Sequence, residues 1–102
     1  MKRFACILSA VLFVLLLAAA GFTADGAALY GKCAGCHGAD GAKKALGTGQ
    51  PLKGLSAADL SKALNGYKAK TYGGAKKEIM EARAAQLSSA DIQALAKFVA
   101  GF

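Results

Sequence analysis

Apolar residues recur at helical spacing near the end of the chain. Positions i, i+3, i+4 and i+7 of one predicted helix face are taken by Ile92, Leu95, Ala96 and Val99. Gly101 follows this stretch, and glycine commonly ends helices. The pattern predicts a helix from about Ser89 to Ala100 that packs through a single apolar stripe.

Two segments share a local code that is typical of helix starts. Residues 55–60 read LSAADL, and residues 87–92 read LSSADI. In each, a serine can cap the first turn, an aspartate three residues later supplies the acid of a short capping box, and the flanking apolar residues form a staple. We therefore expect one helix to begin near Ala57 and the other near Ser89.

The helix from Ala57 should bury Leu60 and Leu64 and stop near Asn65 and Gly66, because this pair is a common C-terminal signal.

The remaining pattern predicts an all-α fold of about four helices. A first helix should start near Asp25, carry Leu29 and Tyr30, and lead into the segment around Cys33. Alanine is abundant in residues 24–102, whereas β-branched residues are few there, so little of this sequence favours strands.

The first 23 residues have the layout of a secretory signal peptide. A basic start precedes an apolar run from Phe4 to Ala20, and small residues follow. Cleavage after Ala20 or after Thr23 is compatible with these small residues, and we favour the later position. This divides the chain into a signal peptide (1–23) and a domain (24–102). A retained membrane anchor is the alternative, since about 20 uncharged residues can span a bilayer.

A domain of this size needs help to be stable. Removing the first 23 of the 102 residues leaves 79, and the loss of Lys2 and Arg3 lowers the formal net charge from +7 to +5. So small a core usually requires a disulfide, a metal or a cofactor. Two long glycine-rich connections, 47–54 and 66–74, are expected only if they wrap something large, and a flat cofactor fits that requirement.

Residues 33–37 read CAGCH, which is the C-x-x-C-H attachment motif of c-type haem. Residues three apart share a face of a helical turn, so the sulfurs of Cys33 and Cys36 can both reach the vinyl groups on one porphyrin edge. His37 then projects beneath the iron as an axial ligand. We predict one covalently bound haem c with thioethers at Cys33 and Cys36.

Other interpretations of the motif each lack a part. A structural zinc site needs four ligands, but Cys33, Cys36 and His37 are the only cysteines and histidine in residues 24–102. A thioredoxin-like pair needs a βαβ context, which the sequence does not predict. A disulfide between the two cysteines would close a loop too short to stabilise much.

The sixth iron ligand is assigned by elimination. Within residues 24–102 Met80 is the single methionine, and lysines or an open position are the other choices. Met80 follows Gly73 and Gly74, in a segment free to close over the opposite haem face. A role as core filler is the alternative. His/Met ligation would raise the reduction potential and leave no vacant position, which favours an electron carrier over an enzyme.

With these residues in place, the chain resembles the class I mono-haem cytochromes c, and more narrowly the small periplasmic cytochromes of sulfate-reducing bacteria. The resemblance covers residues 24–102. Its matching text is ADGAALY at 24–30, CAGCHGADG at 33–41, Gly66-Tyr67, Tyr72-Gly73-Gly74, Met80 and Ala94-Leu95-Ala96.

The resemblance implies roles for several side chains. It makes His37 and Met80 the axial pair, and it implies that the Pro51 carbonyl accepts a hydrogen bond from the outer ring nitrogen of His37. A plain turn role for Pro51 is the alternative. Tyr67 or Tyr72 would hydrogen-bond a haem propionate. The first and last helices would cross beside the haem through Leu29, Tyr30, Leu95 and Phe98.

We therefore expect a periplasmic electron carrier that performs one-electron outer-sphere transfer, is not an enzyme and has no small-molecule substrate. Six lysines should lie near the haem rim and steer a soluble, monomeric protein towards acidic docking faces of redox proteins: Lys43, Lys44, Lys68, Lys70, Lys76 and Lys77. A generic solvated surface is the alternative. By resemblance, formate dehydrogenase or hydrogenase would be a donor. No nucleic acid is expected to bind, because the sequence has no stripe of interleaved aromatic and basic residues.

Two other functional classes stay open. One is an enzyme or gas sensor in which Met80 leaves the iron, and prompt carbon monoxide binding would favour it. The other is a membrane-anchored subunit of a respiratory complex, which would require the N-terminal segment to be retained.

Overall fold

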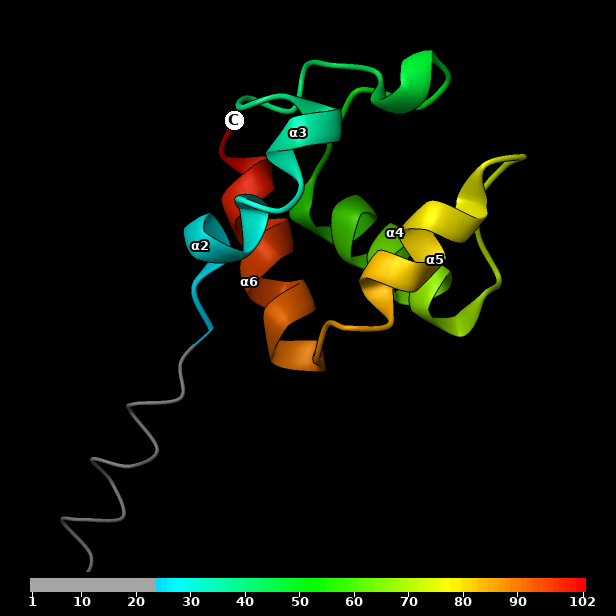
Figure 1. Ribbon diagram of the computed structural model, residues 1–102. Helices are drawn as coiled ribbons and strands as arrows, with labels where there is room; N and C mark the ends of the chain where they lie inside the picture. Colours follow the sequence, from blue (N-terminus) through cyan, green and yellow to red (C-terminus); the bar gives the residue numbers. More distant parts are fainter. Residues whose placement is uncertain (1–23) are drawn as a thin grey trace, which may run out of the picture.

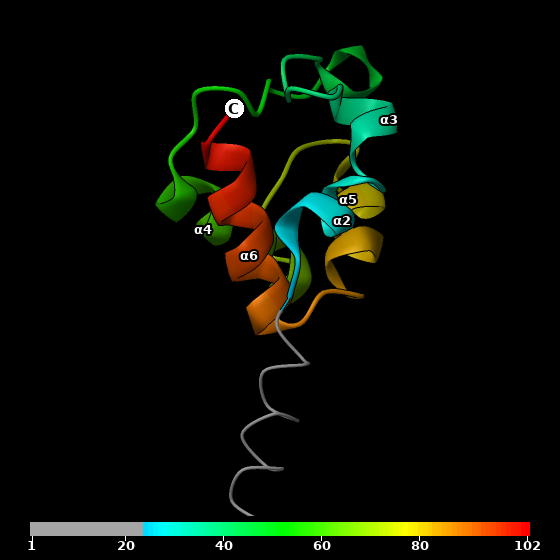
Figure 2. The same ribbon diagram turned by 90° about the vertical axis from the view of Figure 1, so that its left-hand side faces the viewer.

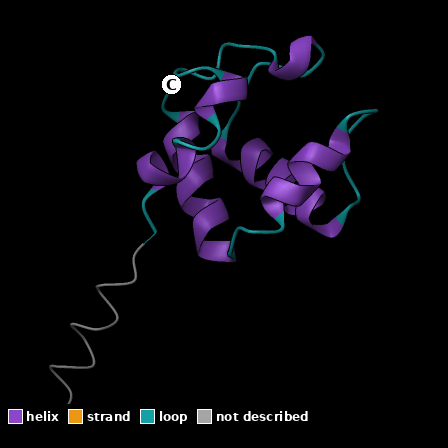
Figure 3. Cartoon of the chain, in the orientation of Figure 1, coloured by secondary structure: helices purple, strands orange, loops and turns teal. Residues whose placement is uncertain are grey.

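The computed structural model describes residues 24–102, so the expected signal peptide and its cleavage site lie outside the described residues. Within 24–102 the chain forms five α-helices, one 3₁₀ turn and no strand (Figure 3). The elements are α2 (Gly26–Tyr30), α3 (Ala34–His37), η1 (Ala45–Gly47), α4 (Ala57–Ala69), α5 (Lys77–Ala84) and α6 (Ser89–Ala100). The all-α prediction is confirmed, with α5 as an additional helix. None of these helices is long and apolar enough to cross a membrane.

The last helix is the centre of the domain. Helix α6 lies between α2 on one side and α4 on the other, and α5 packs against α4 (Figures 1 and 2). The predicted stripe on α6 is buried at all four positions: Ile92, Leu95, Ala96 and Val99. The helix begins at Ser89 and is followed by the Gly101 cap, as predicted.

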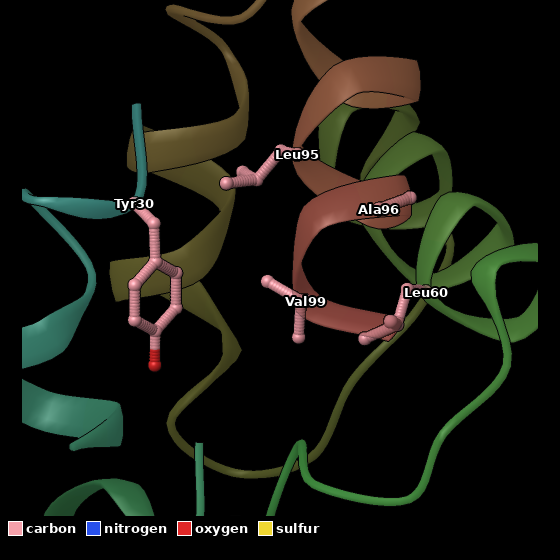
Figure 4. Close-up of a cluster of buried hydrophobic side chains, with 5 residues drawn as sticks. All are labelled: Tyr30, Leu60, Leu95, Ala96 and Val99. Carbon is pink, nitrogen blue, oxygen red and sulfur yellow. The ribbon is translucent and has the colours of Figure 1, made fainter. Parts of the chain in front are cut away.

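One small apolar cluster joins the three central helices. Figure 4 shows Leu95 and Val99 on the side of α6 that faces Tyr30 of α2, and Ala96 on the side that faces α4, where Leu60 completes the cluster. The ring of Tyr30 also packs edge to face on Phe102, with ring centroids 4.9 Å apart. The two ends of the described chain are thereby joined next to α3.

Three of the helices start at the positions that the sequence predicted, and each has a side-chain cap. The Asp25 carboxylate accepts hydrogen bonds from the first turn of α2, and the Ser56 hydroxyl accepts one from Asp59 at the start of α4. At α6 the box is complete: the Asp91 N–H donates to the Ser88 hydroxyl at 3.1 Å, and the Ser88 N–H donates to the Asp91 carboxylate at 3.0 Å.

Replacing Ser88 with alanine is expected to lower the free energy of unfolding by about 1 kcal/mol, because it leaves a first-turn N–H of α6 without its side-chain acceptor. Denaturant unfolding of the haem-bound protein measures the change. Ser89→Ala is the matched control, since Ser89 is the first helical residue and not the cap. Equal stability of the two variants would show that the Ser88 cap contributes nothing.

The predicted end of α4 is wrong. The helix continues past Asn65 and Gly66 to Ala69 and is capped by Lys70 in the left-handed conformation, with φ 62°. Gly66 stays inside the helix because its bare backbone makes room for another side chain: a Cβ there would lie 2.6 Å from the Cβ of Tyr72. The missing side chain at Gly66 therefore serves packing and does not end the helix.

Helix α5 was not foreseen, since no side chain caps it. Its N-cap residue, Lys76, makes no side-chain capping hydrogen bond, and Ala84 is the one residue of the helix that is buried. Met80, which the sequence placed in a free segment, lies in the middle of this helix.

Candidate haem site

Helix α3 brings the C-x-x-C-H residues together in a single turn. Cys33 occupies the N-cap position, and its carbonyl accepts hydrogen bonds from the N–H groups of Cys36 at 3.2 Å and His37 at 3.0 Å. Both cysteines are free thiols; Cys33 is half-buried and Cys36 is exposed. The turn therefore presents two unpaired sulfurs and one imidazole from five consecutive residues.

Within residues 24–102, His37 is the one polar residue that is buried, and it is 9% exposed. Burial lowers the pKa of His37, so its imidazole is neutral near pH 7, the form that binds a metal. Its Nδ1 atom is buried and has no hydrogen-bond partner among the described residues. A buried nitrogen without a hydrogen bond costs free energy in the folded state.

The suggested hydrogen bond from His37 to the Pro51 carbonyl is not present, because Nδ1 has no partner within residues 24–102. The residues after Pro51 form hydrogen bonds with another loop: the N–H groups of Leu52 and Lys53 both donate to the Gly41 carbonyl, at 2.7 and 3.0 Å. In this structure Pro51 is therefore a loop residue.

Backbone contacts hold the chain on the far side of His37. Gly38 has φ 82°, a conformation that favours glycine, and its carbonyl accepts hydrogen bonds from the Tyr30 hydroxyl and from the Gly41 N–H. The Lys43 N–H donates to the His37 carbonyl at 3.1 Å. Tyr30 thus links the α2–α6 core directly to the end of the motif helix.

Met80 lies in the middle of α5, one helical turn before Arg83, and is partly buried. Burial raises the pKa of the Cys33 thiol, and the positive charge of the Arg83 guanidinium acts in the opposite direction. The main packing partner of α5 is α4.

A separate hollow lies on α5 and is lined by Glu78, Ile79, Ala82, Arg83 and Gln86. It includes neither the cysteines nor His37 and Met80, so it is not the site of the predicted ligands.

The residues present fit haem c. Two free thiols stand three positions apart beside a buried imidazole that is neutral near pH 7, which is the donor set that covalent haem attachment requires. The zinc alternative has no geometric support, because no three Cys, His, Asp or Glu side chains gather within residues 24–102.

Comparison with known proteins identifies the family of the chain. The family model described as cytochrome c matches residues 23–101. The chain belongs to the cytochrome c family. This membership implies covalently bound haem c, and the fold is that of the small class I mono-haem cytochromes, as the resemblance predicted.

Curated relatives are all named cytochrome c-553. The protein of Nitratidesulfovibrio vulgaris (strain DSM 19637 / Miyazaki F) is 41% identical over 99 residues, covering 97% of each chain. That of Desulfomicrobium norvegicum is 46% identical over 78 residues, covering 76% of this chain and 95% of the relative. That of Helicobacter pylori (strain ATCC 700392 / 26695) is 42% identical over 86 residues, covering 84% and 86%. The chain is accordingly a haem-based electron carrier of the cytochrome c family.

Two contributors to the site were missed by sequence reasoning. Arg83 follows Met80 at i+3, a spacing that puts both on neighbouring parts of one helix surface, but α5 itself was not predicted. The Tyr30 hydroxyl was assigned to the helix crossing alone, and its partner, a backbone carbonyl eight residues away, has no signature in the sequence.

Proposed function

We propose that this cytochrome transfers single electrons between redox proteins through a haem whose thioethers are at Cys33 and Cys36 and whose axial ligands are His37 and Met80. The observation that carries the proposal is the single turn of α3 in which the buried His37 imidazole follows directly after the second of two free thiols. When bound, the haem iron supplies a centre that changes between the ferrous and ferric states.

The protein's own residues would hold this centre. The α3 turn and the contacts at Gly38 fix the His37 backbone, and Met80, in the middle of α5, would supply the second axial ligand. Because both axial positions are taken in this arrangement, no position is open for a substrate, and the proposed role is that of a carrier and not of an enzyme.

Partners are proposed to be redox proteins with acidic docking faces. Lys43 and Lys44 precede η1. Four further lysines lie at the end of α4, in the connection to α5 and at the start of α5: Lys68, Lys70, Lys76 and Lys77. All six are exposed. Positive charge in these places speeds association with an acidic face and makes it sensitive to salt. The signal-like segment 1–23 supports export to the periplasm, and formate dehydrogenase or hydrogenase is the proposed donor by resemblance.

Replacing Met80 with alanine tests the axial assignment. The ferric protein is expected to lose the weak near-infrared band that reports iron bound to a methionine sulfur. Its reduction potential should fall by on the order of 0.1 V or more, since axial ligands set haem potentials over a range of about 0.8 V. The ferrous variant should also bind carbon monoxide promptly.

Ile79→Ala is the matched control, because Ile79 is the adjacent residue on α5 and carries no sulfur. It should keep both the band and a potential close to that of the parent. A parent protein without the band, or a Met80→Ala variant that retains it, would contradict His37/Met80 ligation and favour a sensor or enzyme.

A further inference from the structure

Two tyrosines at the connection between α4 and α5 pack against each other. Tyr67 lies in the last turn of α4 and Tyr72 in the connection that follows, and their rings meet edge to face with centroids 5.0 Å apart and planes at 89°. This connection forms the projecting tip on the side of the molecule away from α2 (Figure 1). An aromatic pair of this geometry stabilises the fold, even though the Tyr72 side chain is 45% exposed.

Each tyrosine packs against the glycine that is adjacent in sequence to the other tyrosine. A Cβ at Gly66 would lie 2.6 Å from the Cβ of Tyr72, and a Cβ at Gly73 would lie 2.6 Å from the Cε1 of Tyr67. Real Cβ atoms do not approach other atoms this closely, so neither position accepts a side chain without movement. Gly73 also has φ 112°, which side chains rarely adopt. The two tyrosines and two glycines form one interlocked unit, which we call the tyrosine clamp.

Hydrogen bonds close the same unit onto α4. The Thr71 N–H donates to the Gly66 carbonyl at 2.9 Å, and the Lys70 N–H donates to the Tyr67 carbonyl at 3.1 Å. The connection is therefore folded back on the last turn of α4 and does not extend freely into solvent.

The clamp continues into the first residue of α5. A Cβ at Gly73 would lie 2.7 Å from the Cβ of Lys77, so Gly73 is held between the Tyr67 ring and the start of α5. The Lys77 N–H donates to the Gly74 carbonyl at 3.1 Å. Met80 stands three residues further along the helix.

Apart from packing on α4, the first half of α5 has few side-chain anchors. The helix has no side-chain cap, its neighbouring residues Glu78 and Ile79 are exposed, and its buried residue, Ala84, lies at the opposite end. A helix of eight residues with these properties does not keep its position by itself.

We propose that Tyr72 is a positioning residue for Met80: packed on Tyr67 and Gly66, its ring fixes the start of α5 and so keeps the Met80 sulfur at the iron. This inference rests on the proposed His37/Met80 ligation. The ring carries the effect through packing, and the hydroxyl is not required.

The test compares Tyr72→Ala with Tyr72→Phe in the haem-bound protein. Added imidazole binds ferric haem only when Met80 leaves, so its binding rate reports how often α5 opens. The rate should rise about tenfold in Tyr72→Ala, as expected for loss of an aromatic pair, and the near-infrared band should weaken. Tyr72→Phe keeps the ring and should match the parent in both measurements.

Val99→Ala separates positioning from general destabilisation. It removes apolar volume from the core on α6 and should lower the denaturant midpoint without changing the imidazole rate. The proposal is overturned if Tyr72→Ala binds imidazole at the parent rate, or if Val99→Ala accelerates binding as much as Tyr72→Ala does. A parent protein without the near-infrared band would instead refute the Met80 ligation, and the clamp assignment with it.

Discussion

Replacing Cys33 and Cys36 together with alanine is expected to leave the chain without stable helices, because the variant cannot attach haem. The apolar core within residues 24–102 is small: Ile92 is the one large side chain that is less than 2% exposed, and the cluster around Val99 has five buried members. A core this small gives only marginal stability against the conformational entropy of folding, so the contacts that haem supplies decide the balance. Far-ultraviolet circular dichroism at 25 °C should show the loss of most helical signal.

Gly35→Ala is the matched control for this double variant. Gly35 lies between the two cysteines in α3, and a Cβ there meets no atom within 4 Å, so the motif and its attachment chemistry remain intact. It should keep the helical signal of the parent. Near-parental helix content in the double cysteine variant would show that the protein core is sufficient and that haem is not required for folding.

Features that depend on neighbouring residues were predicted well. The Ser88 cap, the buried stripe of α6 and the Asp25 start of α2 each follow from side chains within a few positions of the element they define. The same reasoning failed where a distant residue decides the outcome. Gly66 predicted a helix end, but Tyr72 fills the space beside it and α4 continues to Ala69.

The haem site divides in the same way. The C-x-x-C-H turn is a local motif, and the structure places Cys33, Cys36 and His37 in one turn of α3 as expected. The position of Met80, the proposed second ligand, depends on α5. This helix has neither a capping side chain nor an apolar stripe, so its helical form comes from packing on α4. Sequence reasoning could name Met80 by elimination, but it could not place the residue.

Replacing Gly26 with alanine is expected to lower the free energy of unfolding of the haem-bound protein by about 2–3 kcal/mol. Two effects oppose each other. Alanine favours a helix over glycine by at most about 1 kcal/mol. At this position, however, the new Cβ would lie 2.7 Å from the Cβ of Phe98 and closer still to the Ala94 carbonyl oxygen. That oxygen belongs to the α6 backbone and cannot move without shifting the helix, so the clash outweighs the propensity.

Denaturant unfolding distinguishes the two effects, since the clash predicts a lower midpoint with an unchanged slope and propensity alone predicts a higher one. Gly74→Ala is the control, because a Cβ there meets nothing within 4 Å and the change should stay within about 0.5 kcal/mol. If Gly26→Ala is as stable as the parent, α2 can slide on α6 at no cost. The close crossing would then not be what holds Tyr30 against the Gly38 carbonyl, and the link from the core to the His37 turn would need another origin.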